Sequence, residues 1–130
     1  MSLVQKISDL ATAIGSQIKV RITAEHPCVA KAWVCFGYVG EQMVIRAAYN
    51  VQGVTRLGVG KYRVYFAHAL LDANYAWLAT ARDGGAQAPL QFAGARLSEE
   101  LKTTDFIDVV CASPSGKFSD TPEMSLMVLR

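Results

Sequence analysis

The sequence predicts a mainly β protein, an antiparallel β-sandwich of about seven or eight short strands preceded by one N-terminal amphipathic helix. Two observations predict this fold class. The first 20 residues place apolar side chains at helical spacing, and the rest of the chain alternates apolar and polar residues in short runs separated by turn-forming residues. The 130 residues, 52% of them hydrophobic, suffice for a buried core. We therefore expect a helix within residues 1–22 and a β-sandwich over residues 23–130.

The predicted N-terminal helix has a broad apolar face and a polar face. Ser2 and Gln5 form an S-x-x-Q capping box, which would satisfy free amides at the helix start. Isolated helices of this length are marginal in water, so a packing partner is implied. Two interpretations stay open: the helix packs on its own domain, or it forms a short parallel coiled coil that joins identical chains. The apolar face consists of Leu3, Val4, Ile7, Leu10, Ala11, Ile14 and Ile18.

Strand-like patterning begins after His26-Pro27, where the proline ends any helical tendency. The run "KAWVCFGY" alternates apolar and polar residues, and "MVIRAAYN" follows it after a glycine-containing turn. The segment "VTRLGVGKYRVYF" predicts a hairpin in which Tyr62, Val64 and Phe66 share one face. No Ser or Thr follows the lysine of its "GVGK", so we interpret these residues as a turn and not as a phosphate loop.

The second half of the chain predicts the remaining strands and two long connections. The connections are Asp83–Leu101, which begins with "DGGAQAP", and Ser113–Pro122. Within the first, "SEEL" predicts a helical turn capped by Ser98. The strands are expected in "YAWLATAR", "LQFAGARL", "DFIDVVCA" and "EMSLMVLR".

Composition argues against several classes of function. The net charge of +2 comes from cations scattered along the chain, whereas a nucleic-acid surface needs several cations on one patch. Cys28, Cys35 and Cys111 form no C-x-x-C pair, so we expect neither a disulfide framework nor a zinc site, and no cofactor. No run of 18 apolar residues predicts a membrane span, and Lys6 and Asp9 interrupt the apolar stretch that an export signal needs.

No constellation of residues predicts catalysis, so we expect a protein that is not an enzyme. His26 and His68 lie far apart in the sequence, and no G-x-S-x-G nucleophile elbow is present. Asp108 falls within a strand, where its alternation predicts an outward-facing carboxylate on a half-exposed sheet. Arg63 and Tyr65 share the face opposite the hairpin core, and such a second face is a natural contact between subunits.

Four segments occur in an order that resembles the distal C-terminal domain of tailed-bacteriophage tail fibres. They are "KAWVCF" at Lys31–Phe36, "IRAAYNV" at Ile45–Val51, "GVGKYRVYF" at Gly58–Phe66 and "DANY" at Asp72–Tyr75. The helix-forming "LVQKISDLATAIGSQIK" is similar to the segment that precedes such domains. The resemblance implies a homotrimeric β-structured tip domain over residues 23–130. Its oligomerisation helix, residues 1–22, would form a short trimeric coiled coil.

The resemblance also implies a place and partners for the protein. It implies a component of the virion tail, made in the bacterial host cytoplasm, that contacts the host cell receptor during adsorption. Its partners would be two further copies of itself, other phage tail proteins, and a host surface glycan or protein receptor, with no nucleic acid and no membrane insertion. The alternative is a small structural virion protein of the tail or capsid, needed for assembly and without receptor binding.

Receptor contacts are expected in the two long connections, because these have no counterpart in the family. Host specificity would reside in such variable surface loops. The candidate residues are Asp83, Gln87, Gln91, Ser115, Lys117 and Phe118.

Overall fold

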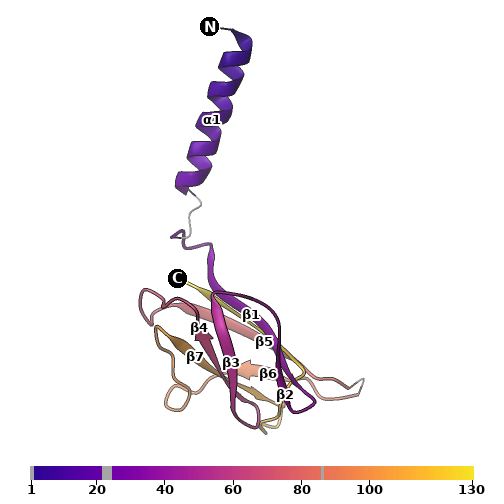
Figure 1. Cartoon of the computed structure of the whole chain (residues 1–130). Coiled ribbons are helices and arrows are strands. Elements are labelled where there is room, and N and C mark those ends of the chain that lie inside the picture. Colours follow the sequence, from indigo (N-terminus) through magenta and orange to yellow (C-terminus); the bar gives the residue numbers. More distant parts are fainter. Residues whose placement is uncertain (1, 22–24, 86) are drawn as a thin grey trace.

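A computed structural model describes residues 2–21, 25–85 and 87–130, with side chains for residues 2–17, 25–85 and 87–130. In these ranges one helix precedes eight strands, which form two four-stranded antiparallel sheets (Figure 1). The predicted β-sandwich preceded by a helix is confirmed. The predicted domain boundary between residues 22 and 23 lies outside the described residues. The elements are α1 (Leu3–Arg21), β1 (Ala30–Val39), β2 (Gln42–Tyr49), β3 (Val51–Gly58), β4 (Lys61–Phe66), β5 (Ala76–Arg82), β6 (Phe92–Gly94), β7 (Phe106–Ala112) and β8 (Glu123–Leu129).

The core lies between the two sheets and follows the alternation seen in the sequence. The first sheet has the strand order β2-β1-β8-β5, and the second has the order β3-β4-β7-β6. Successive side chains of a strand point to opposite faces, so every second residue of β1, β4 and β8 enters the core. The buried residues of these three strands are Ala32, Val34, Phe36, Tyr62, Val64, Phe66, Met124, Leu126 and Val128.

The connections between strands divide between two ends of the sandwich. β1 runs from the end where the helix precedes it to a turn at Gly40 and Glu41, and the antiparallel pairings fix the direction of every other strand. The end beside the helix, here called the helix end, carries residues 25–29 and 67–75 and the C-terminus (Figure 1). The opposite end, here called the tip, carries residues 40–41, 59–60, 83–91 and 113–122.

Gly60 closes the predicted hairpin between β3 and β4 at the tip. Its φ of 66° lies in the left-handed region, where a side chain is disfavoured. A Cβ atom there would approach the Cys111 carbonyl oxygen to 2.7 Å and two Ser119 backbone atoms to 2.8 Å. The hairpin tip is therefore packed against β7 and the connection after it, which confirms a turn at "GVG" and explains why its last residue is glycine.

Two local predictions differ from the structure in detail. The run "LQFAGARL" contributes only the short edge strand β6, which pairs with the far end of β7. The turn at "SEEL" begins at Arg96 instead of Ser98, since the Arg96 carbonyl accepts hydrogen bonds from Glu99 N and Glu100 N. The Glu100 carboxylate also accepts a hydrogen bond from Arg96 N at 2.6 Å. The hydrogen bonds that close this turn are thus made by Arg96 and Glu100, whereas the sequence predicts a cap at Ser98.

Candidate interaction surfaces

The tip is built from two long connections that lie beside each other. Thr121 Oγ1 donates to the Arg82 carbonyl at 2.7 Å, which ties the end of the second connection to the start of the first. Gln91 Nε2 donates to Ser119 Oγ at 2.9 Å and to the Asp120 carbonyl at 3.3 Å. The predicted receptor loops therefore form one continuous surface at the end of the sandwich opposite the helix.

Asp120 fixes the second connection to the β3–β4 hairpin. Its carboxylate accepts two hydrogen bonds from Arg56, at 3.0 and 2.8 Å, one from Gly60 N at 3.0 Å and one from the Tyr62 hydroxyl at 2.8 Å. The hydrogen bonds from Arg56 are the main cause that holds the pKa of Asp120 below its usual value. Tyr62 Oη also accepts from Thr121 N at 3.1 Å, and burial raises the pKa of this hydroxyl. The second connection is thus fixed to the hairpin by the hydrogen bonds of Asp120 and Thr121.

Five of the six predicted receptor-contact residues reach the surface, and one does not. Asp83, Gln87, Ser115 and Lys117 are exposed. Phe118 is partly buried and lies between two cations, with Lys61 Nζ at 5.3 Å and the Arg96 guanidinium at 5.1 Å from its ring centre. The sixth residue, Gln91, is only 9% exposed and makes the loop contacts described above. It supports the tip from within.

The apolar face of α1 is exposed to solvent. Five of its side chains are each more than half exposed: Leu3, Val4, Ile7, Leu10 and Ile14. Ala11 is exposed as well, and the side chain of Ile18 lies outside the described set. Ser2 Oγ accepts a hydrogen bond from the backbone N of Gln5 at 3.1 Å, as the capping box predicts. The side-chain Nε2 of Gln5 donates to the Asp9 carboxylate at 2.9 Å. Figure 1 shows the helix extending away from the sandwich, so its described apolar side chains do not pack on the chain's own domain.

The outer face of the first sheet carries an apolar surface that sequence analysis did not single out. The register aligns Trp33 of β1 with Tyr49 of β2 on one side and Met127 of β8 on the other, and Met127 with Leu78 of β5. Each of these four residues is at least a third exposed. β1 and β8 lie at opposite ends of the sequence, so only their pairing reveals this row.

The outer face of the second sheet mixes charged side chains with exposed apolar ones, Leu57 and Phe92. Arg63 Nε and Nη2 donate to the two Asp108 carboxylate oxygens at 2.7 and 3.0 Å, and the Arg63 guanidinium stacks over the Phe106 ring at 4.0 Å. Asp108 also accepts from Leu101 N at 3.2 Å. Asp108 points outward as predicted, but it is 5% exposed instead of half-exposed, because Arg63 and the segment at Leu101 cover it.

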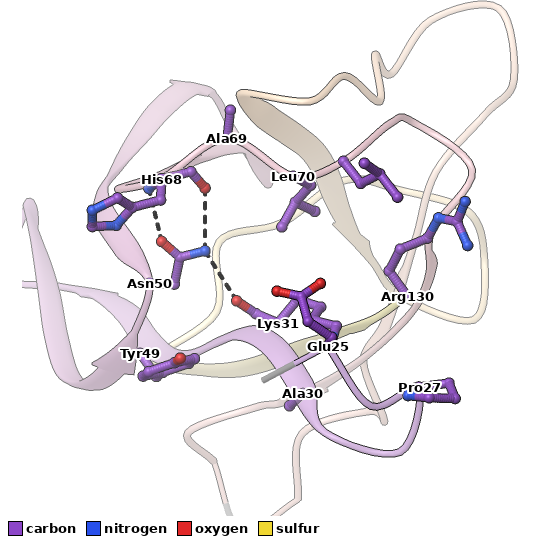
Figure 2. Close-up of a pocket in the computed structure, with 11 residues that line it drawn as sticks. Glu25, Pro27, Ala30, Lys31, Tyr49, Asn50, His68, Ala69, Leu70 and Arg130 are labelled. Carbon is purple, nitrogen blue, oxygen red and sulfur yellow. Dashed lines mark hydrogen bonds between the residues drawn. The ribbon is translucent and has the colours of Figure 1, made fainter. Parts of the chain in front are cut away.

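A cavity of about 540 Å³ opens at the helix end, and Figure 2 shows it. Asn50, whose φ is 52°, joins two segments that line this cavity. Its side-chain amide donates to the carbonyls of Lys31 at 3.0 Å and His68 at 3.2 Å, while its oxygen accepts from His68 N at 2.7 Å. The residues that line the cavity are Glu25, Pro27, Ala30, Lys31, Tyr49, Asn50, His68, Ala69, Leu70, Leu71 and Arg130.

Charged groups are present among the described residues that line the cavity, but none of these residues is a nucleophile beside a base. Figure 2 shows the Glu25 carboxylate turned toward its middle. Arg130 is bound to Asp72 at 2.9 and 2.7 Å, and this hydrogen bond is the main cause that lowers the pKa of Asp72 to about 2. The second histidine, His26, lies in the turn before β1, where its Nδ1 accepts from Cys28 N at 3.1 Å. The His26 side chain thus contacts a nearby backbone amide, and the backbone of His68 is held by the Asn50 side chain.

The described residues provide neither a cluster of metal ligands nor a helix that could span a membrane. Nowhere in residues 2–21, 25–85 and 87–130 do three or more His, Cys, Asp or Glu residues gather as metal ligands. The described helix is not long and apolar enough to cross a membrane. Comparison with models of protein families, with curated proteins and with solved structures gives no match for this chain.

Proposed function

We propose that the chain is the tip domain of a tailed-bacteriophage tail fibre and acts as a homotrimer that contacts a receptor on the host cell surface. One arrangement carries this proposal. A helix whose described apolar side chains are exposed lies at one end of a β-sandwich. The two connections without a family counterpart form a surface at the other end. Copies joined through their helices would therefore direct three sets of tip loops away from the junction.

The exposed helix face supports association with other copies. A helix of 19 residues is near the lower limit of stability in water, and a fully solvated apolar face does not stabilise it. The sequence repeats apolar residues at the spacing of a coiled-coil seam in two possible heptad registers. One register uses Val4, Ile7, Ala11, Ile14 and Ile18, and the other uses Leu3, Ile7, Leu10 and Ile14. A face as broad as this fits a trimer, in which each helix contacts two neighbours.

The residues of the four family-like segments have structural roles that leave the tip loops available for binding. Asn50 ties β1 to the loop after β4, and Gly60 closes the hairpin. Tyr75 is buried, and its hydroxyl donates to the Thr103 carbonyl at 2.8 Å. Such residues form the scaffold, and function on a rigid scaffold usually resides in the exposed loops that it holds.

The receptor role is tested by binding of fluorescently labelled protein to a panel of bacterial strains. We expect saturable binding to a subset of strains, and we expect Lys117→Glu at the tip to weaken it. Lys6→Glu is the matched control, because it makes the same charge change on the exposed polar face of the helix. Saturable binding that responds equally to both variants, or no binding by an intact trimer, would contradict the receptor role. The second result would favour the structural virion protein without receptor binding, whose place electron microscopy of the virion would show.

A further inference from the structure

The outer face of the first sheet changes in polarity from the helix end to the tip. A row toward the helix end contains Tyr49, Trp33, Met127 and Leu78, aligned across all four strands. The next row contains the small side chains of Ala47, Cys35, Ser125 and Thr80. On the tip side of these rows, Arg82 Nη1 donates to the Glu123 carboxylate at 2.8 Å. The large apolar side chains of this face thus lie toward the helix end of the sheet.

We propose that this outer face is an interface between copies of the chain, packed around a threefold axis that continues from the helices. The proposal rests on the trimer proposed above and adds the surface through which the sandwiches meet. β1, the strand that follows the helix, is one of the two central strands of this sheet and not of the other. In a trimer joined at the helices, we place the outer face of β1 of each sandwich toward the common axis.

The charge distribution favours a second copy as the occupant of this face. Residues close to a threefold axis approach their own copies, so charges there would repel one another, whereas the two rows described above are uncharged. The outer face of the second sheet carries Lys61, Arg63 and Asp108, which makes it a poorer surface for self-contact. A partner selected by charge would find no charged side chain in these two rows.

The width of the sheet fits three copies. Four strands about 4.8 Å apart occupy roughly 19 Å, and the sides of an equilateral triangle of that width lie roughly 5.5 Å from its centre. Sheets that pack face to face are about 10 Å apart, so each lies about 5 Å from the plane between them. Three such sheets would close a triangular prism filled by one layer of side chains. At its corners Tyr49 on β2 of one copy would approach Leu78 on β5 of the next.

The size of the face explains why the helix is also needed. Seven residues of strand length and four strands give a face of roughly 19 by 23 Å, or about 440 Å² per copy before side-chain relief is counted. A stable pairwise interface usually buries about 800 Å² per partner, and in a trimer each face is shared between two such interfaces, so the sheet supplies about a quarter of this area. The helices would supply the rest, and loss of either surface should weaken the trimer.

The test compares two matched substitutions in the full chain. Leu78→Asp places a charge on the proposed interface, and Leu57→Asp places one on the outer face of the second sheet. The two leucines are 56% and 50% exposed, and both lie on edge strands. By sedimentation at several protein concentrations, we expect Leu78→Asp to weaken association at least tenfold and Leu57→Asp to leave it unchanged. Equal association of both variants with the wild type would overturn the proposed face.

If Leu78→Asp does not fold, a second measurement tests whether the outer face of the first sheet is buried in the trimer. Trp33 is partly exposed in one copy, whereas Trp77 packs against the core. We expect acrylamide to quench the tryptophan fluorescence of the trimeric wild type less than that of the chain dissociated by Ile7→Asp and Ile14→Asp. Equal quenching with an intact trimer would overturn the face alone. A wild type that is monomeric at micromolar concentration would instead overturn the trimer proposal, and the face with it.

Discussion

A few residues at the tip determine how its loops are held. Gly60 is forced to be glycine by its backbone angle and by the close approach of Cys111 and Ser119. Asp120 is the hub of the hydrogen bonds that join the second long connection to the hairpin. Because both residues position a surface without belonging to its exposed part, their substitution should change stability first.

Gly60→Ala should destabilise the fold by about 2 kcal/mol or more, since it adds left-handed strain to a steric overlap with backbone atoms. Urea unfolding at a fixed protein concentration measures this change. Gly53→Ala is the matched control, because a Cβ atom at Gly53 meets nothing within 4 Å and its backbone angle is not in the left-handed region. A similar free energy of unfolding for both variants would show that the hairpin tip can relax.

Asp120→Asn should lower the free energy of unfolding at pH 7 by about 2 kcal/mol, because it removes a charged acceptor of several hydrogen bonds. The pKa of Asp120 is lower in the folded than in the unfolded chain, so its ionised form stabilises the fold above the unfolded pKa. That stabilisation is lost as the pH falls from about 4 through the folded pKa. Urea unfolding at pH 7 and pH 3 should therefore show a difference between wild type and variant that shrinks in acid. A difference independent of pH would contradict this role.

The helix and the strands differ in how far their sequence determines their contacts. The alternation of β1 and β4 predicts which side chains enter the core, and the structure confirms it. The periodicity of α1 predicts an apolar face but not what covers it, since docking on the domain and joining of copies require the same pattern. The exposure of that face in the structure favours the second interpretation.

Ile7→Asp with Ile14→Asp should weaken association, because charges placed in a helical seam lose solvation without gaining partners. Sedimentation and light scattering measure the mass, and circular dichroism reports whether the sandwich stays folded. Thr12→Asp with Ser16→Asp places the same two charges on the exposed polar face and should leave the mass unchanged. Unchanged mass and melting temperature in the Ile7 and Ile14 variant would show that the helix has no role in assembly.

At the scale of the whole molecule, pairing between distant segments decides what the sequence alone does not reveal. The sequence predicts the sandwich, the helix and the two long connections. It does not reveal the apolar row on the first sheet, since Trp33 and Met127 become neighbours only when β1 pairs with β8. Gln91 and Asp108 read as surface residues because polar side chains are mostly exposed. Each is buried because a distant loop or arginine supplies its hydrogen bonds.

The arrangement of the whole chain gives each end a separate task. The helix and the adjoining apolar sheet face would join copies, and the opposite end would present the loops that carry Asp83, Gln87, Ser115 and Lys117. Assembly and recognition would then be separable by substitution, since the helix seam and the tip share no described residue. A tip variant such as Lys117→Glu should keep the mass of the wild type while it changes binding to cells.

The measurement that tests the central claim most directly is the mass of the wild-type protein in solution at micromolar concentration. Sedimentation equilibrium gives this mass without reference to shape, which matters for a chain with an extended helix. We expect three times the 14.1 kDa of one chain. A mass of 14.1 kDa that does not rise with protein concentration would contradict the account.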